Sequence, residues 1–147
     1  MQWFCNKVVF SFIASILLSG CFFFDNDFDP IVAEYNIGWI DTEETRSICK
    51  GLEVGDTGGE TVVQEYVFAV GHNDQYIVAK QHPLDYTKSP IVDTKTINYF
   101  VIDYTKHPYA GQQGIFGPMD LNTYKKLNSE LGIGEVEFDM IYPDDPN

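Results

Sequence analysis

The stretch VVQEYVFAVGHNDQYIVAKQ, residues 62–81, decides the fold. Its two outer parts, 62–70 and 75–81, are rich in β-branched and aromatic residues, which favour strands. Between them lies Gly71-His72-Asn73-Asp74, a short polar segment of the kind that closes an antiparallel hairpin. The sequence therefore predicts a β-hairpin here.

Further short strands are predicted on both sides of this hairpin. The candidates are residues 33–40, 45–50 and 97–103, with an edge strand in the tail at 135–142. In INYFVID, residues 97–103, alternation places Ile97, Tyr99 and Val101 on one face and Asn98, Phe100 and Ile102 on the other. Loops at 51–60, 82–96 and 105–114 separate these segments.

One helix is predicted over LNTYKKLNSEL, residues 121–131. Asp120 is a natural N-cap, and Gly132 stands at the C′ position that favours glycine. Leu121, Tyr124, Leu127 and Leu131 recur at helical spacing and are expected to form the buried stripe. The expected fold class is α+β, an antiparallel β-meander with one C-terminal helix packed on the sheet.

The N-terminal segment has the features of a secretory signal. Residues 1–7 carry one basic and no acidic side chain, residues 8–18 form an apolar run, and Ser19-Gly20 supplies small residues before a cysteine. Leu18-Ser19-Gly20-Cys21 resembles the bacterial lipobox. That resemblance implies transfer of a diacylglyceryl group to the Cys21 sulfur, cleavage before Cys21 and further acylation, for example with palmitate.

An uncleaved membrane helix is the alternative for this segment. Phe22-Phe23-Phe24 follows Cys21, so residues 8–24 form a largely apolar stretch near the lower limit of ~17 residues for a bilayer span. The lipobox and the break at Ser19-Gly20 favour processing. We therefore expect a signal peptide at 1–20, a lipidated N-terminus with an acidic tether at 21–32, and a single α+β domain at 33–147.

The tether segment 25–30, DNDFDP, also invites a calcium interpretation because acidic residues alternate there. Pro30 stands where a calcium loop requires glycine, and Asn36 stands where the loop requires a bidentate glutamate. A solvated tether ending at the proline is therefore expected.

The charge of the chain limits its partners. The net charge is −13, from 22 acidic and 9 basic residues, and removal of residues 1–20 would delete only Lys7 of the charged residues. Such a charge opposes binding to nucleic acid and to anionic membrane surfaces, and it permits cationic partners or divalent ions. The residue after the modified cysteine is Phe22 and not the aspartate that retains lipoproteins at the inner membrane, so the outer membrane is favoured in a cell with two membranes.

The chemistry-bearing residues form no familiar catalytic or metal-binding motif. Cys49 lacks a nucleophile signature. His72, His82 and His107 are too widely spaced to nucleate a zinc site and are expected as loop histidines in solvent, although a cluster formed in space stays open. The glycine-rich loop 51–60 lacks the lysine of a phosphate loop and is acidic. No enzyme activity, metal or cofactor is therefore expected, and Trp39, beside Gly38, is a candidate for a binding face although a core position is favoured.

Three segments carry a family resemblance: QYIVAKQHP at 75–83, NYFVID at 98–103 and GPMDLNTYKKLNSELGI at 117–133. Together they resemble a group of small bacterial lipoproteins with an uncharacterised domain, over roughly residues 62–133. Met119, where that group usually has leucine, and the longer loop at 105–114 depart from its pattern. The resemblance implies an envelope lipoprotein and no particular reaction.

Three hypotheses for function follow. The first is a lipid-anchored binding or structural module of the bacterial envelope, attached to the membrane through Cys21 and able to contact a protein partner. The second is an inhibitor or immunity-type protein against a cationic toxin or envelope enzyme, steered by the negative charge. The third is an envelope hydrolase, which requires a deep pocket that gathers histidines and carboxylates.

Overall fold

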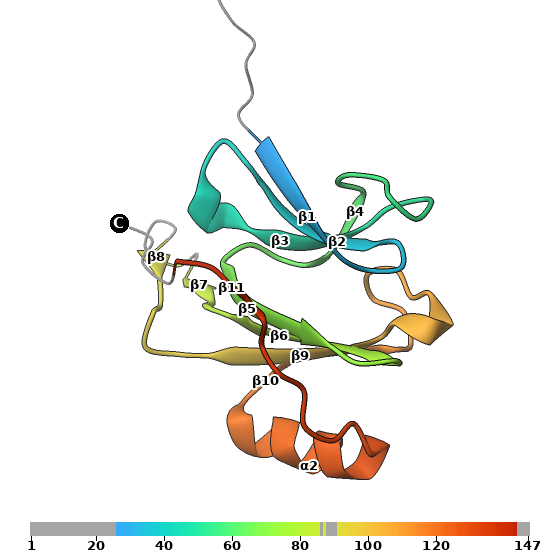
Figure 1. Cartoon of the computed structure of the whole chain (residues 1–147). Helices are drawn as coiled ribbons and strands as arrows, with labels where there is room; N and C mark the ends of the chain where they lie inside the picture. The colour runs from blue at the N-terminus through green and yellow to red at the C-terminus, as the bar shows by residue number, and fades with distance from the viewer. Residues whose placement is uncertain (1–25, 86, 88–90, 144–147) are drawn as a thin grey trace, which may run out of the picture.

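The computed structural model describes residues 26–85, 87 and 91–143, and there the chain forms a separate pair of short strands, two larger antiparallel β-sheets and one α-helix. Figure 1 shows the two larger sheets and the helix as three layers, with the four-stranded sheet above the five-stranded sheet and the helix below both. We call the four-stranded sheet sheet A and the five-stranded sheet sheet B.

Sheet A has the strand order β1-β2-β3-β4. Its strands are β1 (Asn26–Val32), β2 (Tyr35–Ile40), β3 (Ser47–Lys50) and β4 (Glu60–Val63), with the 3-10 helix η1 (Glu43–Thr45) between β2 and β3. The expected tether is therefore wrong from Asn26 onward, because these residues pair with β2 as an edge strand. Pro30 is tolerated there because an edge strand needs backbone hydrogen bonds on one side only.

Phe28 explains why this acidic segment joins the sheet. It lies opposite Gly38 in the register, and its ring covers that glycine so closely that a Cβ there would lie 2.1 Å from a ring carbon. The absence of a side chain at Gly38 thus makes room for an aromatic ring. Strand β1 begins at Asn26, seven positions before the expected domain boundary at residue 33.

Sheet B has the order β10-β9-β6-β5-β11 and contains the predicted hairpin. Its strands are β5 (Val67–His72), β6 (Tyr76–Gln81), β9 (Asn98–Asp103), β10 (Ile115–Met119) and β11 (Met140–Ile141). In the hairpin Val70 lies opposite Ala79, and β11 confirms that the tail adds an edge strand. A separate pair of short strands consists of β7 (Leu84–Asp85) and β8 (Ile91–Val92).

Residues 62–70, which were expected to form one strand, are divided between the two sheets. Val62 and Val63 belong to β4, the chain turns at 64–66, and Val67 begins β5. Tyr66 adopts a left-handed φ of 67° in this turn, and the Gln81 side-chain amide donates to the carbonyls of Gln64 and Glu65. The expectation of one continuous strand over 62–70 is wrong, because the chain turns at the polar pair Gln64-Glu65 and at Tyr66.

Two apolar clusters hold the layers together. The cluster between the sheets includes Ile37, Ile48, Val70, Ile77 and Ile102. The cluster between sheet B and the helix combines Tyr76, Val78, Val101 and Ile133 with partly buried side chains of the helix and tail. Sheet B is therefore covered on both faces, and the alternation predicted for β9 is confirmed.

Helix α2 (Leu121–Leu131) forms within the predicted bounds. The Asp120 carboxylate accepts a hydrogen bond of 2.7 Å from the Thr123 amide, and Gly132 has a left-handed φ of 65°. Leu127 and Leu131 pack on sheet B, and the Tyr124 ring stacks on Tyr99 at 4.9 Å. The stripe expected to be buried is only half-buried at Tyr124, Leu127 and Leu131, and Leu121 departs from it, since 43% of it is exposed.

The α+β fold class is confirmed, with antiparallel strands and a C-terminal helix packed on a sheet. The strands divide into two facing sheets, a detail that spacing alone did not predict. Within the described ranges, no helix combines the length and the apolar character needed to cross a bilayer.

Candidate functional site

Charged residues gather at one end of the molecule, where a loop of sheet B reaches sheet A. Glu34 lies in the turn between β1 and β2, Lys50 ends β3, and His107 and Tyr109 follow the 3-10 helix η2 (Tyr104–Lys106). We call these four residues the charged cluster. Glu34 and Lys50 are 9% and 6% exposed, so two opposite charges are largely removed from water.

Short contacts join the members of the charged cluster. His107 Nδ1 donates to Glu34 Oε1 at 2.6 Å, and Lys50 Nζ lies 3.8 Å from the same oxygen. Lys50 Nζ also donates to the His107 carbonyl at 2.8 Å and lies 3.5 Å from the centre of the Tyr109 ring. Every charge in the cluster therefore has a partner of opposite sign or an aromatic face, as buried charges require.

The electrostatics of the cluster favour an ionised glutamate. Burial raises the pKa of the Glu34 carboxyl, but the hydrogen bond from His107 and the charge of Lys50 outweigh it. The pKa of Glu34 therefore lies below its ordinary value of 4.5. Next to it, burial raises the pKa of the Tyr35 hydroxyl, which donates to the Pro108 carbonyl at 2.8 Å.

The Asp103 carboxylate binds the start of the loop that carries His107. Asp103 accepts hydrogen bonds from Thr105 Oγ1 at 2.6 Å and from Lys106 Nζ at 2.9 Å. Burial raises the pKa of Asp103, but these bonds outweigh it, so the pKa lies below its usual value. The segment 104–114 is thus tied to both sheets.

The chemistry of the charged cluster is better suited to structure than to catalysis. A histidine oriented by a carboxylate is the base half of a catalytic triad. Here, however, Lys50 binds the backbone carbonyl of that histidine and Tyr35 binds the next carbonyl, so the cluster closes a loop onto the sandwich. We interpret the cluster as a latch between the two sheets.

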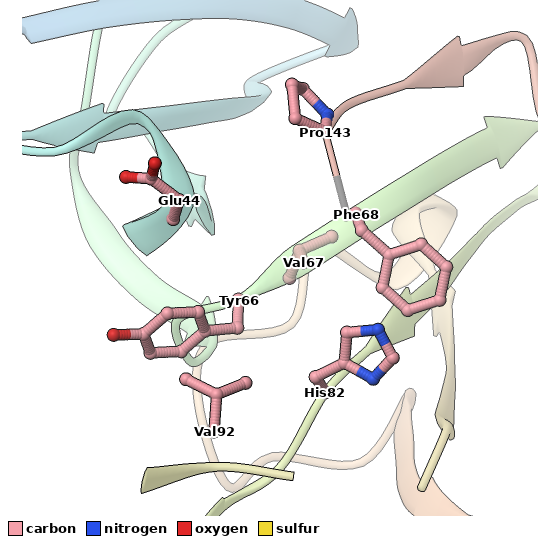
Figure 2. Close-up of a pocket in the computed structure, with 7 residues that line it drawn as sticks. All are labelled: Glu44, Tyr66, Val67, Phe68, His82, Val92 and Pro143. Atoms are coloured by element: carbon pink, nitrogen blue, oxygen red, sulfur yellow. The ribbon is translucent and has the colours of Figure 1, made fainter. Parts of the chain in front are cut away.

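His82 lies apart from the charged cluster, next to Phe68 (Figure 2). His82 is 3% exposed, its ring stacks on Phe68 at 4.4 Å, and its Nδ1 lies 2.8 Å from the Thr96 carbonyl oxygen. The adjacent hollow, bordered also by Glu44 and Tyr66, measures about 10 Å³. That volume suits one water molecule and no organic substrate. The expectation of a histidine in solvent is wrong for His82.

A larger hollow of about 240 Å³ lies on the outer face of sheet A, the face turned away from sheet B. Small residues of the strands and of the glycine-rich loop form much of its lining, among them Gly38, Cys49 and Gly58. Trp39 also borders the hollow but is 9% exposed, so it takes the core position that the sequence favoured and offers no exposed aromatic surface there.

The other candidates from the sequence stand apart from one another. Cys49 is buried, burial raises the pKa of its thiol, and its sulfur lies 3.8 Å from the Thr61 hydroxyl oxygen. His72 is an exposed residue at the end of β5. Within the part of the chain that the structure describes, no group of three histidine, cysteine or acidic residues is arranged to hold a metal ion. Leu18, Ser19, Gly20 and Cys21 lie outside the described residues.

The charged cluster was not predicted from the sequence. Glu34 and His107 are 73 positions apart, and neither belongs to a recognisable motif. A second buried cation is Arg46, which is 8% exposed. Its guanidinium lies 4.4 Å from the centre of the Tyr142 ring, and the Tyr142 hydroxyl donates to Asp29 in β1.

Comparison with known proteins gives a family and nothing more specific. A family model described as a protein of unknown function, DUF3997, matches residues 33–142. No curated protein and no solved structure matches the chain. The match covers most of the chain and extends beyond the segment 62–133 on which the resemblance was based.

Proposed function

The chain belongs to the DUF3997 family, whose function is unknown, and we propose that it is a lipoprotein of the bacterial envelope, anchored by lipid on Cys21. The observation that carries this proposal is the sequence Leu18-Ser19-Gly20-Cys21 after an apolar run and shortly before the folded domain. Two or three acyl chains at one cysteine would hold a protein on a membrane stably.

The position of β1 sets how far the domain can stand from the membrane. Asn26, the first residue of β1, follows Cys21 by five positions. An extended chain of that length spans at most about 18 Å. The anchored domain would therefore lie close to the bilayer surface, with no long tether between them.

For the domain itself we propose a binding or structural role. The charged cluster is used to close a loop, and the hollow beside His82 has room for about one water molecule. Among the described residues, the lining of the 240 Å³ hollow on sheet A includes no histidine. These features favour a surface that binds over a pocket that catalyses. In a cell with two membranes, Phe22 after the lipidated cysteine favours the outer membrane.

The experiment that tests this proposal compares the wild-type chain with Cys21→Ser in a bacterial host supplied with labelled palmitate. We expect the wild type to take up the label and to fractionate with membranes. Cys21→Ser should lose the label, because it lacks the sulfur that accepts the diacylglyceryl group. A matched variant, Cys49→Ser, should keep it, since that thiol is buried in the domain. Equal labelling of the wild type and Cys21→Ser would contradict the proposal.

The negative charge supports a second candidate function, an inhibitor of a cationic envelope protein. With a net charge of −13, the chain would attract such a partner at long range, and salt would screen the attraction. Cross-linking and capture of the intact lipoprotein from its own envelope should then yield one stoichiometric partner at low salt that is lost at high salt. Capture of no enriched protein at low salt would rule this candidate out.

A further inference from the structure

We propose that the outer face of sheet A carries a second membrane contact, in which the apolar side chains of Ile40, Leu52 and Val54 rest in the lipid interface. We call these three residues the apolar rim. The inference rests on the proposed lipid anchor and deepens it, because it states which face of the domain meets the bilayer. The ligand is a phospholipid surface.

The apolar rim consists of large side chains left in water. Leu52 is 85% exposed, Val54 is 77% exposed and Ile40 is 56% exposed. Ile40 lies opposite Asn26, the first residue of β1, so it sits where the chain from the proposed anchor enters the sheet. Leu52 and Val54 lie in the loop between β3 and β4.

That loop is held against the outer face of sheet A. The Asp56 carboxylate accepts hydrogen bonds from the amides of Leu52 and Glu53 at 3.0 and 2.9 Å. The Asn36 side chain donates to the carbonyls of Asp56 and Gly58. The loop therefore presents its two apolar side chains on a fixed support.

The start of β1, the strand nearest in the chain to the proposed anchor, lies on the same side of the molecule as the β3–β4 loop. Figure 1 shows the start of β1 and the β3–β4 loop above sheet A, while helix α2 lies at the opposite end. The Phe28 ring joins them, since it covers Gly38 and lies near Gly58. A connection of at most about 18 Å from Cys21 to Asn26 would bring this side toward the bilayer.

Charge selects the kind of lipid surface. Asp41 follows Ile40, while Glu53 and Asp56 share the loop with Leu52 and Val54. These carboxylates would be repelled by anionic headgroups, so a zwitterionic surface suits this face better. Apolar side chains at an interface enter roughly 5–10 Å, to the boundary of headgroups and acyl chains.

The test places a fluorophore at single cysteines in the lipidated, full-length protein. Leu52→Cys and Val54→Cys report the apolar rim, and Leu121→Cys, 43% exposed on helix α2, is the matched control at the far end. Each variant carries a polarity-sensitive dye and is reconstituted in phosphatidylcholine vesicles, with and without a spin-labelled lipid. Cys49 is buried and should label poorly.

We expect blue-shifted emission and strong quenching at positions 52 and 54, and neither at 121. Addition of phosphatidylserine should reduce the blue shift and the quenching. If the protein carries its lipid but positions 52 and 54 emit as in water, the second contact is overturned while the anchor stands. If the intact mass shows no lipid on Cys21, the proposed anchor fails and this inference fails with it.

Discussion

Glu34 acquires its role only through folding. It lies in the turn between β1 and β2, and its partners Lys50 and His107 come from a strand of sheet A and a loop of sheet B. Removal of one member of such a buried group leaves the charge of the remaining member without a partner. The resulting loss of stability is larger than the net stabilisation that the intact group provides. The cluster should therefore matter for stability although it is small.

At the residue scale we predict that Glu34→Gln destabilises the domain by about 2 kcal/mol at neutral pH, because Lys50 and His107 lose a charged acceptor. The folded pKa of Glu34 is lowered below its ordinary value of 4.5. Its carboxylate therefore stabilises the fold fully above that value and loses this effect as the pH falls through the folded pKa. Urea unfolding of both proteins from pH 7 to pH 3 measures the difference.

The matched control is Glu130→Gln on helix α2, where the carboxylate is 59% exposed and lies 3.7 Å from Lys126. An exposed pair of this kind contributes roughly 0.3–0.5 kcal/mol. The latch interpretation would be contradicted if Glu34→Gln were no more destabilising than Glu130→Gln, or if the difference between wild type and Glu34→Gln stayed constant down to pH 3.

Single residues differ in how far the sequence predicts their surroundings. Asp120 and Gly132 were predictable, because a helix cap depends on neighbours within one turn. His82 and Glu34 were not, because their burial depends on segments distant in the chain. Local chemistry can be predicted from the sequence, whereas a contact across 73 positions requires the strand order.

At the element scale the turn at 64–66 determines the architecture. Strand-forming residues run from Val62 to Val70, and their composition predicts one strand. The chain instead changes sheet at Tyr66, and Gln81 from the partner strand of the hairpin holds the turn through two carbonyls. The hairpin was predictable from its polar turn, but the division into two sheets was not.

Helix α2 gives a prediction at the same scale. Asp120→Ala should destabilise the domain by about 1 kcal/mol, because the Thr123 amide loses its acceptor at the start of the helix. Asn122→Ala, at an exposed position of the same turn, should change stability by less than roughly 0.5 kcal/mol. Urea unfolding midpoints of the two variants provide the comparison. Equal midpoints would show that the cap contributes nothing to the fold.

At the scale of the whole molecule, the outer faces of the two sheets differ in what covers them. Helix α2 covers the outer face of sheet B, so that face is buried. Among the described residues, the glycine-rich loop and Phe28 lie over the outer face of sheet A, which keeps a hollow of about 240 Å³. The start of β1 lies on the side of the molecule toward which this outer face is turned (Figure 1).

The central claim is that Cys21 is the first residue of a mature, lipid-modified protein. The intact mass of the protein extracted from a membrane fraction tests this most directly. We expect a chain that begins at Cys21 and carries the added mass of a diacylglyceryl group, with or without a further acyl chain. An intact mass that still includes residues 1–20, or a chain that begins at Cys21 without added lipid, would contradict the account.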